Sequence, residues 1–168
     1  MLIHLFRHGI AIDRTDPECP AEEQRHLTDK GVRRTKMGAR GLARMGVTAQ
    51  LILSSPFTRA QQTAEIAKKA LKLKGVEIRE TNALLWDADP GSLRAELAGL
   101  TDVEEVLCAG HAPHLDLFVA HMVGTPMPVT ELKKAGFATL STDFSDPGDA
   151  VLQALYSPRA LRELGDGW

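Results

Sequence analysis

Three short hydrophobic runs constrain the fold of this chain more than any other feature of its sequence. They are nearly continuous rather than alternating, and they cover Leu2–Phe6, Gln50–Leu53 and Val103–Ala109. Strands that are covered by helices on both faces have this pattern, because neither face meets water. Amphipathic segments separate the runs. We therefore predict an α/β fold, a three-layer sandwich with a mostly parallel central sheet and helices on both faces.

Three segments between and after these runs have a helical pattern and a recognisable start or stop. Thr28 is the expected N-cap of the first helix. Ser55 as N-cap and Pro56 at the first helical position are the expected start of the second. Gly124 is expected to end the third. The predicted helices cover Thr28–Met45, Pro56–Leu73 and His114–Val123.

The C-terminal part of the chain has a different pattern. Gly136–Thr142 and Asp149–Tyr156 have strand character and are joined by the turn-rich sequence SDPG, which predicts a C-terminal hairpin or an antiparallel edge strand. The chain has 168 residues, with no internal repeat and no low-complexity linker. That length suits one hydrophobic core, so we expect residues 1–168 to form a single domain.

Composition and charge argue against several classes of function. The formal net charge is −2, which disfavours nucleic-acid binding driven by overall positive charge, and the basic clusters in helical segments are interpreted as solvated faces. The N-terminal apolar run is too short for a signal peptide, and no run approaches the roughly 18 apolar residues of a membrane helix. Cys19 and Cys108 form no recognisable motif. We expect no membrane association and a reducing, cytoplasmic location.

Each of the three hydrophobic runs is followed by a distinctive polar group. Arg7-His8-Gly9 follows the first, Arg59 lies in the first turn of the helix after the second, and His111 follows the third. The carboxyl ends of parallel strands share one edge of a sheet, where ligands bind. Two arginines and two histidines are therefore expected in one crevice, close to helix N-termini. Arginine forks and helix N-termini both suit phosphate oxygens.

A histidine in such a crevice can attack phosphorus or, when protonated, neutralise charge. The spacing alone does not say which histidine does which. A single histidine at a strand end is more often structural, and that interpretation is kept for His4, His26 and His121. His114 lies three residues beyond His111, but the sequence offers no further ligands at metal-binding spacing, so no metal site is expected.

Four motifs occur in an order that resembles a known family. They read LFRHG, LTDKG, SSPFTRAQQTAEI and VLCAGHAPHLD. The chain is similar to the histidine phosphatase (phosphoglycerate mutase-like) superfamily, and most similar to its small phosphohistidine phosphatase branch. The resemblance implies that His8 is the nucleophile that becomes phosphorylated, that Arg7 and Arg59 hold the phosphoryl group and that His111 completes the pocket. It implies no metal and no cofactor, and a structural role for Thr28 and Gly31.

The chain departs from the family pattern in one place. Many members carry a glutamate there that protonates the leaving group, whereas this chain reads NALLWDADPGSL. Asp87 and Asp89 are the candidate proton donors, but both are also typical turn residues before a short helix capped by Ser92. Absence of a general acid slows the loss of an alkoxide by roughly 10²–10⁴. Loss of an imidazole from phosphohistidine is less demanding, which favours phosphoramidate substrates.

The sequence thus predicts a metal-independent phosphatase that forms a covalent phosphohistidine on His8 and acts on phosphohistidine in a partner protein. One alternative is a phosphatase, or a mutase, for a small phosphorylated metabolite. Another is a phosphate-binding or phosphoprotein-binding module without turnover. The short chain leaves little beyond the core to roof the pocket, although the loop Ile10–His26 is expected to border its entrance. The oligomeric state stays open.

Overall fold

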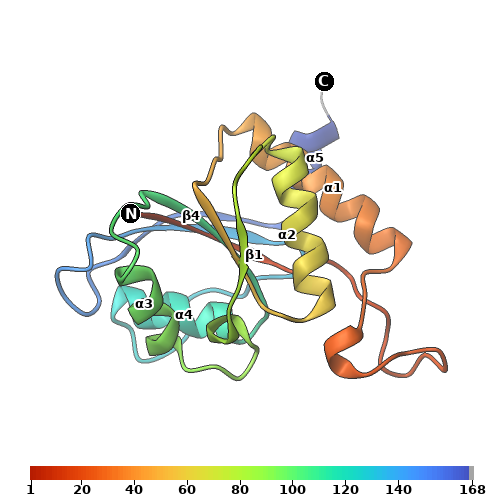
Figure 1. Cartoon of the computed structure of the whole chain (residues 1–168), viewed down its shortest axis with the longest axis horizontal. Coiled ribbons are helices and arrows are strands. Elements are labelled where there is room, and N and C mark those ends of the chain that lie inside the picture. Colours follow the sequence, from red (N-terminus) through yellow and green to blue (C-terminus); the bar gives the residue numbers. More distant parts are fainter. Residues whose placement is uncertain (167–168) are drawn as a thin grey trace.

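A six-stranded sheet runs through the centre of the computed structural model, which describes residues 1–166 (Figure 1). Its strands are β1 Leu2–Arg7, β2 Leu51–Ser54, β3 Ile78–Glu80, β4 Glu105–Gly110, β5 Phe137–Ser141 and β6 Val151–Tyr156. Their order across the sheet is β3-β2-β4-β1-β5-β6. The first four are mutually parallel, and β5 is antiparallel to both β1 and β6. The predicted mostly parallel sheet and C-terminal hairpin are confirmed.

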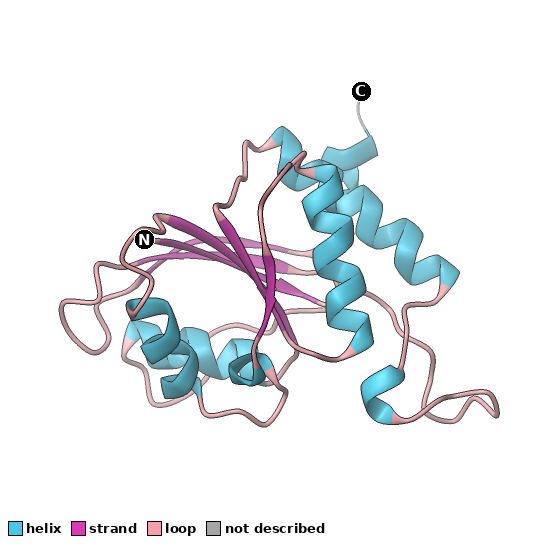
Figure 2. Ribbon diagram, viewed as in Figure 1, coloured by secondary structure: helices cyan, strands magenta, loops and turns pink. Residues whose placement is uncertain are grey.

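Helices cover both faces of this sheet (Figure 2). On one face lie α1 Asp29–Arg44, α2 Thr58–Ala70 and α5 Pro158–Asp166, and on the other lie α3 Pro90–Ala98 and α4 His114–Val123. Two short 3-10 helices, η1 Glu22–Gln24 and η2 Asn82–Leu84, lie in the connections. This is the predicted three-layer α/β sandwich.

Strand β1 shows why the hydrophobic runs are continuous. Leu5 faces the core under α3 and α4, whereas Phe6 faces the core under α1, α2 and α5, and both are fully buried. Successive residues of a strand point to opposite faces, so a strand with a core on each side needs apolar residues at every position.

The predicted bounds of α1 and α4 are confirmed, whereas the predicted start of α2 was wrong. The Thr28 hydroxyl accepts a hydrogen bond from the Gly31 N–H at the start of α1, and α4 has the predicted bounds. Helix α2, however, begins at Thr58 with Phe57 as its N-cap residue. Ser55 is not its N-cap residue: the Ser55 hydroxyl accepts from the Phe57 N–H at 3.3 Å, just before the helix, and lies 2.8 Å from Nε2 of His111.

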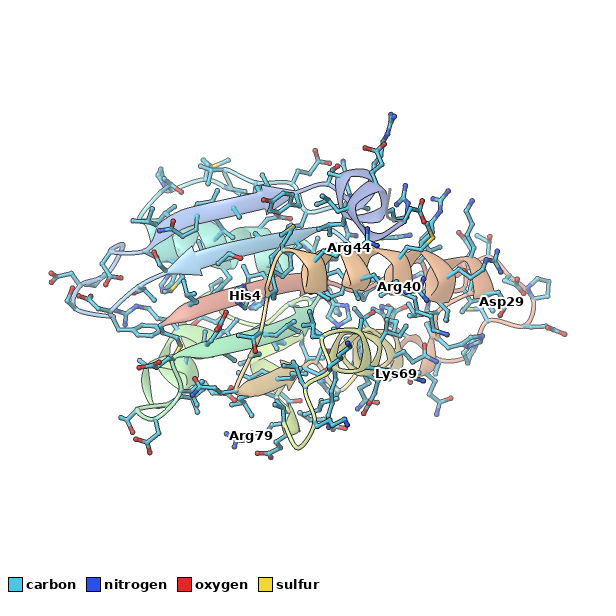
Figure 3. The ribbon with its side chains drawn as sticks, turned by 90° about the horizontal axis from the view of Figure 1, so that it is seen from above. His4, Asp29, Arg40, Arg44, Lys69 and Arg79 are labelled. Carbon is cyan, nitrogen blue, oxygen red and sulfur yellow. The ribbon has the colours of Figure 1, made fainter. Side chains whose placement is uncertain are left out.

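Helix α5 was not predicted. It packs along α1, where the Gly41 position allows close contact, since a Cβ there would lie 2.2 Å from the Leu161 carbonyl oxygen. The basic residues Arg40 on α1 and Lys69 on α2 lie on exposed faces, as interpreted from the sequence (Figure 3). Among the described residues, no helix combines the length and apolarity needed to cross a bilayer.

Candidate active site

The carboxyl ends of β1, β2 and β4 finish level with one another. Arg7 is paired with Gly110 across β1 and β4, and Ser54 with Ala109 across β2 and β4. The next residues continue the ladder: the His8 N–H donates to the Gly110 carbonyl and the Ser55 N–H to the Ala109 carbonyl, both at 3.0 Å. The backbone therefore fixes the spacing between the three polar groups that follow the strands.

A cavity of about 170 Å³ opens at this edge. It contains all four residues that the sequence predicted to come together, namely Arg7, His8, Arg59 and His111. It also contains residues that sequence reasoning did not select: Arg14, Arg25, Trp86, Ala112 and Lys134. The cavity thus has five cationic side chains around two histidines, which is a strongly anion-attracting arrangement.

His8 lies in this cavity as a neutral imidazole. Its Nδ1 lies 2.7 Å from the Gly9 carbonyl oxygen and donates to it, which leaves Nε2 as the unprotonated nitrogen. The Nε–H of Arg59 points to that nitrogen at 3.4 Å. Burial, followed by the neighbouring His111, lowers the pKa of His8 from 6.5 to about 2. A lone pair is therefore available on Nε2 at neutral pH.

Gly9 anchors this arrangement between two helices. Its N–H donates to the Thr63 hydroxyl of α2 at 3.1 Å. A Cβ at this position would lie 2.2 Å from the Thr35 hydroxyl of α1. Glycine is needed here because α1 packs directly against the backbone that follows His8.

His111 is fixed on the opposite side of His8, with their ring centroids 5.1 Å apart. Its Nε2 lies 2.8 Å from the Ser55 hydroxyl, and its ring meets the Phe57 ring edge to face. Its Nδ1 is buried and has no hydrogen-bond partner within residues 1–166. Burial and then the Arg59 charge lower the pKa of His111 to about 3. Nε2 is thus occupied by Ser55, and Nδ1 is the ring nitrogen that lacks a partner among the described residues.

Arg59 is held by a carboxylate that sequence reasoning missed. Its guanidinium donates to the Glu22 backbone carbonyl and to Glu22 Oε1, both at 2.8 Å, and lies over the Phe57 ring. Glu22 also accepts two hydrogen bonds of 2.9 Å from Arg14 and contacts Arg25. The Arg14 hydrogen bonds, with the charges of Arg59 and Arg25, lower the pKa of Glu22 to about 2.

Comparisons with known proteins place this geometry in a family. The sequence model of the histidine phosphatase superfamily (branch 1) matches residues 3–86. The chain is also 37% identical over 161 residues to an uncharacterized protein of Picosynechococcus sp., across 92% of this chain and 90% of that protein. The chain belongs to the histidine phosphatase superfamily. As a member, it is a phosphatase and a hydrolase.

Solved structures of this superfamily have the same fold. The protein histidine phosphatase SixA, complexed with tungstate, has a TM-score of 0.85 and 28% identity, over 96% of this chain and 99% of that one. The alpha-ribazole phosphatase from Shigella flexneri has a TM-score of 0.76 and 17% identity, over 94% and 97% of the two chains. At that identity the second comparison concerns the fold alone.

The two aspartates proposed as proton donors occupy a different position from the rest of the site. Asp87 and Asp89 are exposed and follow Trp86, but neither lines the cavity in the described part of the chain. Asp89 is the N-cap residue of α3, which starts at Pro90, so the expected cap at Ser92 was wrong. A role for either carboxyl in this histidine phosphatase stays a prediction.

His114 gives no sign of a metal site. Its ring is fully buried at the start of α4, and neither ring nitrogen has a hydrogen-bond partner among the described residues. In residues 1–166, no group of three or more His, Cys, Asp and Glu side chains is placed to hold a metal ion.

Proposed function

We propose that this histidine phosphatase hydrolyses phosphohistidine in a partner protein, through a covalent phosphohistidine on Nε2 of His8 and without a metal or cofactor. One observation carries the proposal. The Gly9 carbonyl accepts from Nδ1 of His8, so Nε2 is unprotonated and faces the cavity beside Arg59. A nucleophile needs this tautomer, and a module that only binds phosphate does not.

In the first step, the Nε2 lone pair of His8 attacks phosphorus in line with the substrate nitrogen. The new N–P bond forms as the substrate N–P bond breaks, and the electron pair of the broken bond returns to the substrate imidazole, which leaves as a neutral ring because its other nitrogen already carries a proton. Arg7, Arg59 and Nδ1 of His111 face the equatorial oxygens, where the transition-state charge collects. The Gly9 carbonyl stabilises the positive charge that the His8 ring gains.

In the second step, water attacks the phosphorus of the phosphorylated His8. The bond to Nε2 breaks, its electron pair returns to the ring, and inorganic phosphate leaves. Neutral His8 is restored with its proton still on Nδ1. The same three donors act in both steps, because the equatorial oxygens keep their positions during in-line displacement.

The charge state of Glu22 supports phosphohistidine over an ester. Glu22 contacts Arg59, and its pKa of about 2 keeps it ionised at neutral pH. It therefore has no proton to give to an alkoxide. An imidazole leaving group needs less help, because it can leave already protonated. The similarity to SixA, a protein histidine phosphatase, points the same way.

The decisive experiment compares substrates for the purified chain. A protein phosphorylated chemically on histidine and a panel of small phosphate esters are assayed for kcat/KM side by side. We expect the phosphohistidine protein to be the better substrate and an acid-labile phosphoenzyme to be trapped. His8→Ala should form no phosphoenzyme. Higher kcat/KM for a small ester would instead support the phosphomonoesterase alternative, and full activity of His8→Ala would overturn the mechanism.

The domain organisation, metal independence and cellular location of the chain follow the same proposal. We propose that residues 1–168 act as one domain, since all six strands belong to one sheet. Turnover is expected to survive dialysis against EDTA. A cytoplasmic location is proposed because Cys19 and Cys108 are both free thiols.

A further inference from the structure

A second hollow, of about 590 Å³, shares two residues with the catalytic cavity. Arg7 and Lys134 line both. The rest of its charged lining comes from Arg34 on α1, Lys133 in the loop before β5, and Arg159 and Arg162 on α5. We call these six cations the basic groove. Its remaining lining residues are uncharged, so the described chain places no carboxylate within it.

The concentration of charge is unusual for this chain, whose net charge is −2. Lys133 and Arg159 are paired with Glu131 and Glu163, but these ion pairs are solvent-exposed. Exposed pairs of this kind contribute little and exchange partners readily. Arg34, Lys134 and Arg162 form no ion pair with any residue the structure describes. The groove therefore has free positive charge.

The size of the basic groove decides what it can hold. At about 590 Å³ it is more than three times as large as the catalytic cavity of about 170 Å³, which suffices for a phosphoryl group. Its cations come from four separate segments, namely β1, α1, the loop before β5 and α5, rather than converging on one point. An extended segment with several carboxylates matches such a distribution better than one compact anion does.

We propose that the basic groove binds an acidic segment of the protein that carries the phosphohistidine. This inference rests on the proposed function and names the feature of the partner that the enzyme recognises. Because Arg7 and Lys134 belong to both hollows, a segment in the groove is continuous with a phosphoryl group on His8. Arg34 thus belongs to a recognition surface, not only to a solvated helix face.

The basic groove affects the rate at which the enzyme and its acidic partner associate. Complementary charge at the rim of an interface raises the rate of productive encounter, and ionic strength suppresses the effect. The chemical step at His8 stays unchanged, since Arg34 and Arg162 do not line the catalytic cavity. The predicted signature is a change in kcat/KM that depends on substrate charge and salt, with kcat conserved.

The test uses the double variant Arg34→Glu/Arg162→Glu in the full chain. The matched control is Lys69→Glu/Lys74→Glu, which makes the same charge change at exposed residues away from the groove. Three substrates share the same N–P bond: a phosphohistidine peptide flanked by Asp and Glu, the same peptide flanked by Gln and Ser, and free N-phosphohistidine. Turnover of the free amino acid reports an intact active site. Arg34→Gln/Arg162→Gln replaces the double reversal if that protein does not fold.

For the acidic peptide we expect the groove variant to lose about tenfold or more in kcat/KM, with a flatter salt dependence. The control variant should keep the wild-type value, and the other two substrates should be unaffected by either change. Equal kcat/KM for the groove and control variants on the acidic peptide would overturn the groove assignment alone. Wild-type turnover of small esters with no turnover of any phosphohistidine substrate would overturn the proposed function, and the groove assignment with it.

Discussion

The Nε–H of Arg59 points at Nε2 of His8 across 3.4 Å, so a cation occupies the approach to the proposed nucleophile. A phosphoryl group bound at Nε2 therefore lies within reach of the same guanidinium. We expect a phosphoryl oxygen to accept from the Arg59 Nε–H that points at the lone pair of His8. The Arg59 guanidinium thus has two roles: it donates to neutral Nε2 of His8 before catalysis, and it binds a phosphoryl oxygen during catalysis.

Replacement of Arg59 by lysine should separate charge from geometry. Arg59→Lys keeps the positive charge but loses the planar fork that contacts both His8 and Glu22. We expect kcat/KM for a phosphohistidine protein to fall by about 10²-fold or more, as for removal of an oxyanion-stabilising donor. Lys69→Arg, at an exposed position on α2, is the control for folding. Activity within threefold of wild type would contradict the assigned role.

Neutralisation of Glu22 should tighten anion binding. Glu22→Gln keeps an oxygen that can accept from Arg59 but removes the negative charge that partly offsets Arg14, Arg25 and Arg59. Tungstate or inorganic phosphate should bind several-fold more tightly, because the negative charge of Glu22 no longer repels the anion. Calorimetric titration measures the change. Weaker binding by Glu22→Gln would show that the carboxylate chiefly positions Arg59.

Acidification should leave the two active-site histidines neutral. The pKa values of about 2 for His8 and about 3 for His111 lie below the ordinary histidine value of 6.5, mainly because both rings are buried. Their NMR signals should not titrate between about pH 8 and pH 5, a range in which an unperturbed histidine gains its proton. Binding of tungstate should raise the pKa of His111, because an anion favours the imidazolium.

The same low pKa values make stability depend on pH. Below the ordinary pKa of 6.5, unfolded chains bind protons on His8 and His111 that the folded chain does not bind. The free energy of unfolding therefore falls as the pH decreases through about 6.5. Urea denaturation at a series of pH values would measure it. His8→Gln should reduce this pH dependence, and an unchanged slope would contradict the explanation.

Substitution of the two exposed aspartates should have little effect on phosphohistidine turnover. Asp87→Asn and Asp89→Asn change carboxyls that do not line the cavity in the described residues, and the imidazole product needs no strong acid. We expect kcat/KM to stay within about threefold of wild type. A selective loss of roughly 10²–10⁴ with small esters would identify the changed residue as a proton donor.

Sequence patterns predicted the parts of this site that regular structure positions. Arg7, His8 and His111 follow buried parallel strands, and strand ends share an edge, so their convergence could be foreseen. Glu22 lies in the short 3-10 helix η1 and Lys134 in the loop before β5, and neither segment is long enough for a hydrophobic period that would place it. Ser55 was misassigned because its hydroxyl accepts from the N–H of Phe57, the residue before the first helical residue, and the sequence does not show that α2 begins only at Thr58. Helix α5 was missed although its start has a sequence signal: Pro158 is its first residue, and the Ser157 hydroxyl accepts from the Ala160 N–H.

The backbone hydrogen bonds that join His8 to Gly110 and Ser55 to Ala109 have a consequence for the lifetime of the enzyme. They belong to the central strands, which open only when the sheet opens. The amides of His8 and Ser55 should therefore exchange with deuterium at the slow rate of global unfolding. On heating, activity and tertiary structure should disappear together. No partly unfolded intermediate with reduced phosphatase activity should accumulate during heating.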